Sequence, residues 1–367
     1  MRVKLGDVCE RGSSNLRQSD IEGKTGDYPI FGAAGYIGNV GFYHQEKPYV
    51  AVVKDGAGIG RTTLLPAKSS IIGTMQYLLP KENVLPEYLY YVVRYMHLEK
   101  YFSGATIPHI YFRDYKNEEF NLDDLGRQAE IIDILGRLER LIEFRKKELQ
   151  QLGNLIKARF VEMFGDMLIN PKGLPEQRLD SMADIVSGIT KGRKVKTDEL
   201  FEVPYMAVSN VKDGYIDWST VKTIMATAAE IDQYRLMPGD VLMTEGGDPD
   251  KLGRGAIIHE PPKDCIHQNH IFRVRLKQDI VLSVFMAQYL QQQKAKRYFL
   301  GCAKQTTGIA SINKKQLSAL PVLVPPIKEQ EEFAVYVAQV DKSKAVVEKS
   351  LKETQLLFDS LMQQYFG

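Results

Sequence analysis

The sequence predicts an α+β protein in which two similar globular domains are each followed by a long α-helix. Three observations lead to this prediction. Residues 128–164 resemble residues 330–366 at a constant offset of 202 residues, both segments carry a heptad pattern, and upstream residues 101–105 match residues 298–302 at an offset of 197. A repeat of this length is too long for a solenoid unit, so we expect a duplicated domain with its helix.

Both long segments have the apolar spacing of a coiled coil, with eight of ten seam positions apolar in each copy. A single helix cannot bury such a stripe, and the other copy is the nearest partner. We expect an antiparallel coiled coil with pseudo-twofold symmetry; the alternative is two separate helices, each packed on its own domain. The expected pairing residues are Ile131, Leu135, Leu138, Ile142, Leu149, Leu152 and Ile156 in the first helix, and Phe333, Val337, Val340, Val347, Leu351, Phe358 and Leu361 in the second.

The globular copies show strand, turn and helix signals in the same order. In the first copy, an alternating segment with glycines is followed by an apolar strand, a glycine-rich loop and an aromatic-rich helix at 85–101. The second copy has a matching helix at 281–298. Strict β-α-β alternation is missing, so each copy is predicted as α+β. The expected domains are 1–124 and 166–324, with the long helices at 125–165 and 325–367.

Composition excludes some classes of protein. The 367 residues are 44% hydrophobic and 26% charged, as in ordinary globular chains. No apolar run approaches the roughly 20 residues of a membrane span, and no secretory signal is expected. Cys9, Cys265 and Cys302 lie far apart and outside any Cys-x-x-Cys motif, which favours a reducing cytoplasm. The net charge is only +2, so any binding of nucleic acid must use local positive charge or a partner.

Motifs that suggest catalysis or metal binding are weak. The glycines at 56–60 lack the Lys-Ser/Thr pair of a phosphate-binding loop, and a tight strand-to-strand connection is the better interpretation. Cys265, His267 and His270 lack a fourth ligand and a common zinc spacing, so no metal site is expected. Asp240 and Glu245 lack the nearby lysine of a nuclease site. We expect no catalytic residues.

Several polar residues are candidates for contacts with DNA phosphates or base edges. Lys54 and Arg61 flank the glycine-rich loop, while residues 106–109 and 304–307 lie at matching places before the two long helices. A polar turn held by Pro108 is the alternative for the first of these segments. The candidates are Lys54, Arg61, Thr106, His109, Lys191, Arg193, Asn210, Arg254, Lys304, Gln305, Thr306 and Thr307.

The chain resembles a known family. The duplicated domain and helix, the motif Gly-Ala-Thr-Ile-Pro-His-Ile-Tyr-Phe-Arg-Asp-Tyr at 104–115, and Pro-Val-Leu-Val-Pro-Pro-Ile-Lys-Glu-Gln at 321–330 are similar to the specificity subunit of type I restriction–modification systems. The resemblance covers essentially the whole chain. One departure is that the proline pair before the second helix is replaced by Asp123-Asp124 before the first.

The resemblance implies a function. In that family each globular copy is a target recognition domain for one half of a bipartite DNA sequence, and the helices space the domains and dock two modification subunits. Double-stranded DNA and restriction subunits would be further partners. The resemblance implies no cofactor in this chain, because S-adenosylmethionine, ATP and Mg belong to the partner subunits. A protein scaffold without a DNA role, or a nuclease–specificity fusion, are the alternatives.

Overall fold

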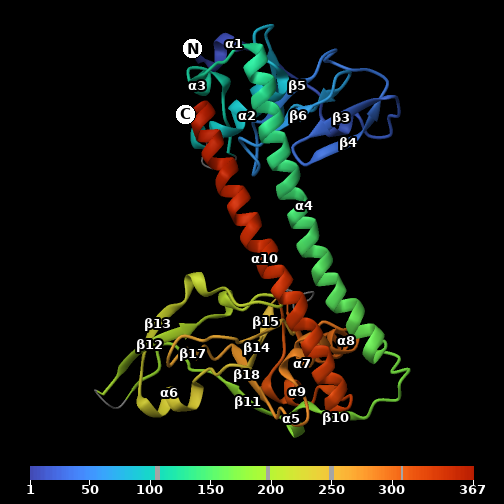
Figure 1. The fold of residues 1–367 in the computed structure, drawn as a ribbon, viewed down its shortest axis with the longest axis vertical. Helices are drawn as coiled ribbons and strands as arrows, with labels where there is room; N and C mark the ends of the chain where they lie inside the picture. Colours follow the sequence, from blue (N-terminus) through green and yellow to red (C-terminus); the bar gives the residue numbers. More distant parts are fainter. Residues whose placement is uncertain (104–107, 196–198, 248–251, 307–308) are drawn as a thin grey trace. The chain divides into compact units, whose positions relative to one another are not determined.

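The computed structural model of the chain describes residues 1–103, 108–195, 199–247, 252–306 and 309–367, without the side chains of residues 304–309. These residues pack as two compact units (Figure 1). Unit 1 comprises Met1–Glu148 and Val347–Gly367, and unit 2 comprises Leu149–Val346. Each long helix therefore contributes one part to unit 1 and the other part to unit 2.

The two long helices are α4, Leu125–Phe164, and α10, Ile327–Phe366. At a rise of 1.5 Å per residue, each is about 60 Å long. α10 follows a proline pair, whereas α4 follows Asp124, whose carboxylate accepts a hydrogen bond from Arg127 N at 3.0 Å. This side-chain cap holds the helix start that lacks the prolines. Among the described residues, no helix has the length and apolar character needed to cross a bilayer.

Unit 1 contains a four-stranded antiparallel sheet and a smaller three-stranded sheet. The strands are β2 Cys9–Ser13, β3 Tyr28–Gly32, β4 Gly35–Val40, β5 Tyr49–Val53, β6 Thr62–Leu65, β7 Ser70–Ile71 and β8 Met75–Pro80. The larger sheet has the order β2-β8-β5-β6, and the smaller sheet has the order β4-β3-β7. Within the smaller sheet, β3 and β7 run parallel.

Unit 2 repeats this topology strand for strand. Its strands are β11 Ala183–Ser187, β12 Phe201–Met206, β13 Lys222–Ala226, β14 Val241–Thr244, β16 Gly255–Ile257, β17 Ile266–His267 and β18 Ile271–Leu276. The larger sheet has the order β11-β18-β14-β16, and the smaller has β13-β12-β17, again with a parallel pair, β12 and β17. The duplication in the sequence is therefore also a duplication of topology. Each unit mixes helices and sheets, as the sequence predicts.

A short ribbon precedes each long helix. In unit 1, β1 (Arg2–Lys4) pairs with β9 (Glu119–Asn121), and in unit 2, β10 (Glu176–Arg178) pairs with β21 (Pro321–Leu323). Each ribbon joins the beginning of a copy to the residues just before its long helix. The short helices are α1 Leu5–Val8, α3 Phe112–Tyr115, α5 Leu179–Met182, α6 Ala228–Tyr234 and α9 Lys314–Ser318.

The two domain helices differ from their expected lengths. α2 is Pro86–Tyr95, and His97 ends it by adopting a left-handed backbone with φ 50°. The helix expected at 281–298 is divided into α7 (Ser283–Leu290) and α8 (Gln293–Cys302), because Gln292 has an extended backbone. The prediction of one continuous helix there is wrong.

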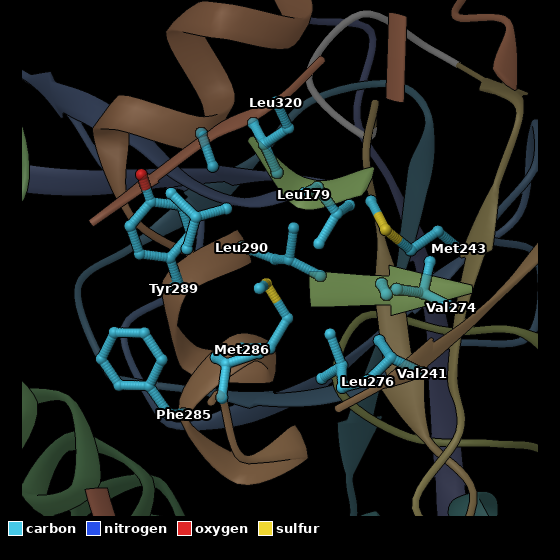
Figure 2. Close-up of a cluster of buried hydrophobic side chains, with 14 of the residues drawn as sticks. Leu179, Val241, Met243, Val274, Leu276, Phe285, Met286, Tyr289, Leu290 and Leu320 are labelled. Carbon is cyan, nitrogen blue, oxygen red and sulfur yellow. The ribbon is translucent and has the colours of Figure 1, made fainter. Parts of the chain in front are cut away.

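In both units the domain helix packs on the larger sheet and forms the core. In unit 1, Tyr88 and Val92 of α2 are buried with Val50 of β5 and Leu78 of β8. In unit 2, Figure 2 shows side chains of α7 facing those of β14 and β18. The residues that carry this contact are Phe285, Met286, Tyr289 and Leu290 of the helix, and Val241, Met243, Val274 and Leu276 of the sheet.

Parts of both long helices belong to each of these cores. In unit 2, Phe333 of α10 lies 5.5 Å from Phe160 and 5.6 Å from Phe164 of α4, measured between ring centroids. In unit 1, Phe366 of α10 lies 5.2 Å from Tyr88, and Ile131 of α4 is buried in the same cluster. In unit 2, the end of α4 thus shares a core with the beginning of α10. In unit 1, the beginning of α4 shares a core with the end of α10.

Burial departs from heptad spacing at the C-terminal ends of both helices. Phe160 and Phe164 are buried four residues apart, and Met362 and Phe366 occupy the same places 202 residues later. They are not among the expected pairing residues, because the buried runs Ile156-Phe160-Phe164 and Phe358-Met362-Phe366 repeat a spacing of four, whereas a coiled-coil seam alternates spacings of three and four. Among the expected residues, Ile131, Leu135, Ile142, Ile156, Phe333, Val337, Val340, Val347 and Phe358 are buried, and Leu138, Leu149, Leu152, Leu351 and Leu361 are half-buried.

A buried glutamine near the start of α4 ties this helix to its domain. Gln128 accepts a hydrogen bond from Leu85 N at 2.8 Å. Its amide nitrogen donates to Asn83 O at 3.0 Å and to Asp123 O at 2.8 Å. Because Leu85 is the N-cap of α2, one side chain joins the beginnings of two helices.

Gln330 makes the same bonds in unit 2. It accepts from Leu282 N, the N-cap of α7, at 2.9 Å, and donates to Ile280 O at 3.1 Å and Pro325 O at 2.8 Å. Both glutamines are fully buried. We call this arrangement the glutamine clamp. Each clamp satisfies an N–H group at the start of the domain helix and two backbone carbonyl groups.

Replacing Gln330 by Leu should destabilise unit 2 by about 3 kcal/mol, because three buried polar groups lose their partner. We expect a lower urea midpoint with an unchanged slope. Gln150→Leu is the matched control, since Gln150 is exposed on α4. Equal midpoints for the two variants would mean that the clamp does not stabilise the fold.

Candidate nucleic-acid interface

Residues 103 and 108–110, which we call the strap, lie against the loop that follows strand β5 in unit 1. Ser103 and His109 exchange backbone hydrogen bonds of 2.8 and 2.9 Å. Gly56 N donates to Pro108 O at 3.0 Å, and Ile110 N donates to the carbonyl oxygen of residue 54 at 3.0 Å. These bonds hold the strap against the loop that follows β5. We call the described surface formed by residues 54–61, 103 and 108–113 tip 1.

The glycine-rich loop of tip 1 is a tight connection between two strands, which confirms the prediction. β5 pairs antiparallel with β6, and Val53 N donates to Arg61 O at 2.9 Å. Gly60 has φ 80°, and a Cβ there would lie 2.6 Å from the backbone nitrogen of Glu99. Since a strand rather than a helix follows, these glycines do not form a phosphate-binding loop at a helix start.

Three side chains form a column at tip 1. The ring centroid of His109 lies 4.1 Å from that of Tyr111, and the Arg113 guanidinium lies 4.6 Å from the Tyr111 centroid. His109 Nδ1 is also paired with Asp55 Oδ1. Tyr111 and Arg113 are exposed, so the column faces solvent. Sequence reasoning missed both residues as candidates, although they lie in the same motif as His109.

Lys54 and Arg61 also lie at tip 1. Lys54 is half-buried beside the strap, and Arg61 is exposed. Arg61 Nη1 donates to Ala33 O at 3.0 Å, which fixes the guanidinium beside the turn between β3 and β4. The structure therefore brings together three of the four candidates from the first copy, Lys54, Arg61 and His109. The fourth, Thr106, lies outside the described residues.

Unit 2 has the corresponding surface at the end of β14. β15 (Gly246–Gly247) pairs with β20 (Ile309–Ser311), which pairs with β19 (Lys304–Thr306). Ile312 N donates to Glu245 O at 2.9 Å, a bond that matches the one from Ile110 in tip 1. We call residues 245–247, 254, 270 and 310–312 tip 2. Lys304, Gln305 and Thr306 form β19, but their side chains, like Thr307, are not among the described parts of the chain.

An acid–histidine pair lies at tip 2 as well. His270 Nδ1 is 2.6 Å from Glu245 Oε2, and the two side chains are 57% and 33% exposed. Glu245 follows β14 and His270 precedes the neighbouring strand β18, where Glu245 N donates to His270 O at 3.0 Å. The sequence indicated no role for either residue, because the pairing depends on how β14 and β18 align.

The remaining candidates of the second copy occupy different environments. Lys191 is exposed. Arg193 is bound to Glu230 by two hydrogen bonds of 2.5 Å, and these bonds lower the Glu230 pKa to about 2. Arg254 is half-buried beside β14, where its carbonyl accepts from Thr244 N at 3.1 Å. Arg193 is therefore committed to an ion pair within unit 2.

Asn210 is fully buried and serves its own loop. Its amide nitrogen donates to Asp217 O at 2.9 Å and to Thr220 Oγ1 at 3.0 Å, and its oxygen accepts from Ala207 N at 2.9 Å. Three of its hydrogen-bonding positions are used, so we do not retain it as a contact for DNA. A buried asparagine in a polar loop has the same local sequence signature as an exposed one, which explains the error.

The residues weighed for metal binding and nuclease chemistry do not lie together in one site among the described residues. Asp240 is buried and accepts from Arg275 at 2.8 and 2.9 Å, which removes it from any pair with Glu245. Cys265 and His267 are buried, whereas His270 is exposed at tip 2. Within the described ranges, no three His, Cys, Asp or Glu residues are grouped as a metal ion would require.

Comparison with known proteins identifies the family. The family model of the type I restriction modification DNA specificity domain matches residues 1–154 and 171–355. The chain belongs to this family. Its duplicated strand order and the glutamine clamps are thus features of a protein with two specificity domains.

Several members of the family are similar to the chain. The EcoKI specificity subunit of Escherichia coli K12 is 22% identical over 274 residues, which cover 71% of this chain and 59% of that protein. The StySPI specificity subunit of Salmonella potsdam is 21% identical over 318 residues, covering 82% and 68%. The chain therefore spans little more than half of the length of the E. coli relative.

Solved structures show the same fold. The S subunit of a type I restriction–modification system from M. genitalium has a TM-score of 0.59 at 15% identity, covering 100% of this chain and 96% of that one. A chain from a study of complex assembly and conformational transition in the type I system has a TM-score of 0.56 at 16% identity, covering 100% and 97%. Tips 1 and 2 therefore lie on two domains that have the fold of the family's specificity domains.

His267 is a buried polar residue behind tip 2. Neither of its ring nitrogens has a hydrogen-bond partner in the part of the chain that the structure describes. Burial, helped by the charge of Arg273, lowers the His267 pKa to about 3. A lowered pKa means that the unfolded chain takes up this proton first, so stability is present above about pH 6.5 and is lost as the pH falls toward 3.

Replacing His267 by Leu should remove this acid sensitivity. The wild-type chain should lose up to about 1.4 kcal/mol of unfolding free energy per pH unit below pH 6.5 from this residue, and the variant should decline less steeply. Urea unfolding at pH 7.5 and 5 measures the difference. His259→Leu, which removes an exposed imidazole, is the control. Identical declines for wild type and His267→Leu would contradict the assignment.

Proposed function

We propose that the chain is the non-catalytic DNA-recognition subunit of a type I restriction–modification complex, and that tips 1 and 2 each recognise one half of a bipartite target. The observation that carries the proposal is the repetition of one specificity-domain topology, with a hydrogen-bonding surface at the same strand end in both copies. Double-stranded DNA offers phosphates to Lys54, Arg61 and Lys191, and base edges to the shorter polar side chains.

The long helices form an antiparallel coiled coil that spaces the two tips. Support comes from the two cores described above, since the beginning of α4 meets the end of α10 in unit 1 and the end of α4 meets the beginning of α10 in unit 2. Helices whose opposite ends meet run antiparallel. Residues Val337, Val340 and Val347 are buried along α10 at coiled-coil spacing, as a continuous seam requires.

The same helices dock two modification subunits. Among the exposed apolar residues of the helices, five lie 11 residues apart within their helix, which is about three helical turns: Phe144 and Leu155 of α4, and Val335, Val346 and Leu357 of α10. Phe144 and Leu155 correspond to Val346 and Leu357 at the 202-residue offset. Exposed apolar stripes mark protein contacts. Two equivalent stripes suit two copies of one partner.

The chemistry of modification and restriction belongs to the partners. The modification subunits supply S-adenosylmethionine-dependent methylation of adenine, and the restriction subunits supply ATP- and Mg-dependent translocation and cleavage. The chain itself contributes binding and spacing. If it docked partners but gave no sequence-dependent methylation, the alternative of a protein scaffold without a DNA role would replace this proposal.

Exchanging the second domain tests the proposal directly. Replacing residues 177–320 by those of a family member should change one half of the methylated sequence and keep the other half, because tip 1 is untouched. Methylation mapped across the genome of cells expressing the hybrid gives the result. A hybrid that changes both halves together would contradict independent recognition by the two copies.

Lengthening one helix should lengthen the gap between the half-sites. Four residues inserted after Gln150 add about 6 Å to α4, and the spacing of B-DNA is about 3.4 Å per base pair, so the gap should grow by about one or two base pairs. A four-residue insertion is a stutter that coiled coils tolerate.

The control is a four-residue insertion after Glu260, in an exposed connection of unit 2, which should leave the gap unchanged. The sequences of both half-sites should be the same in both variants. An active helix variant with the original gap would show that another element holds the two recognition surfaces apart.

A further inference from the structure

Both tips carry a carboxylate paired with a histidine, but the two pairs use different positions. In tip 1, Asp55 and His109 form a backbone bridge, and Nδ1 of the imidazole contacts Oδ1 of the carboxylate. The corresponding backbone bridge in tip 2 is formed by Gly246 and Ser311, which cannot form such a pair. Tip 2 instead pairs Glu245 with His270. The same chemistry is therefore built at the same place from residues that are not equivalent in the duplication.

The carboxylate determines which atoms of each ring are available. An ionised carboxylate can only accept hydrogen bonds, so an imidazole Nδ1 that is held against it carries a hydrogen; His270 is hydrogen-bonded in this way to Glu245, and Nδ1 of His109 contacts Asp55. In the neutral ring, Nε2 is then left as a hydrogen-bond acceptor. The side chains of His109 and His270 are 28% and 57% exposed, so a ligand can approach them. In tip 1, contact with Tyr111 further restricts rotation of the ring.

We propose that His109 and His270 are specificity-determining residues that accept a hydrogen bond at Nε2 from the exocyclic amino group of adenine or cytosine in the major groove. Asp55 and Glu245 are positioning residues, which hold each imidazole with Nε2 free. The inference rests on the proposed function, and it assigns one chemical contact to each recognition surface. Adenine N6 and cytosine N4 are the amino groups that the major groove presents.

The adjacent carboxylate favours a base contact over a phosphate contact. A phosphate would be repelled by Asp55 or Glu245, each within hydrogen-bonding distance of its histidine. Phosphates are better served by the cations of tip 1, namely Lys54, which precedes Asp55 in the chain, and Arg61, which is held at the turn between β3 and β4. In tip 1 the pair thus suits a hydrogen-bond acceptor for base edges, with cations for the DNA backbone on the same tip.

The test uses the full chain in complex with its modification subunits. The target is first defined by mapping methylation in cells, and binding is then measured on duplexes in which each base pair of that target is replaced in turn. His109→Ala and Asp55→Ala should both reduce discrimination roughly tenfold at one and the same base pair of one half-site. His270→Ala and Glu245→Ala should do so at one base pair of the other half-site.

Base analogues identify the contacted group. Replacing the affected adenine by purine, or the affected cytosine by 2-pyrimidinone, removes only the amino group. This change should weaken binding by wild type roughly tenfold and leave binding by His109→Ala unchanged. In a chain that already carries His109→Ala, Asp55→Ala should cause no further loss of discrimination. Asp55→Glu, which keeps a carboxylate, should retain the discrimination that Asp55→Ala loses. A merely structural role of Asp55 would not predict these results. Glu82→Ala removes an exposed carboxylate of unit 1 and is the control.

Three results would overturn the inference. Unchanged discrimination in the His109 and His270 variants would show that neither ring contacts a base. A uniform loss of affinity at all sequences, with a shallower salt dependence, would assign the rings to phosphates. A wild-type complex without any base preference would overturn the proposed function, and the inference with it, whereas the first two results leave that function intact.

Discussion

The glutamine clamp is the interaction on which the rest of each unit depends. The start of the domain helix offers a backbone N–H group, and the segment before the long helix offers a carbonyl group that needs a donor. Gln128 and Gln330 each bring these two starts together through three hydrogen bonds between 2.8 and 3.1 Å. Each glutamine thereby ties the beginning of α4 or α10 to the beginning of the domain helix. Since the domain helix also packs on the central strand, the clamp links the long helix to the tip at the end of that strand.

The two units share one backbone topology but differ in the side chains at their tips. The hydrogen bond from Ile110 in tip 1 recurs from Ile312 in tip 2, and the strand orders agree throughout both sheets. Yet Gly246 stands where tip 1 has Asp55, and Ser311 stands where it has His109. On the proposed function, such a fold would recognise two different sequences, because function resides in the residues at the tip rather than in the scaffold.

The sequence predicts the long-range plan better than the local chemistry. The bounds of α4 and α10 were predicted to within two residues, because heptad spacing and the duplication indicate them independently. The break between α7 and α8 was missed, since neither proline nor glycine occurs at Gln292. The pairing of Glu245 with His270 was missed because it joins residues 25 apart through strand alignment, and Asn210 was misjudged because burial is not visible in a local motif.

The central claim is that two recognition surfaces act at a separation set by the paired helices. Single-molecule mapping of methylated adenine, in cells that express the chain with its modification subunits, measures this most directly. The account predicts two short specific sequences separated by a gap of constant length and unspecified bases. A single continuous target, or two half-sites with a variable gap, would contradict it.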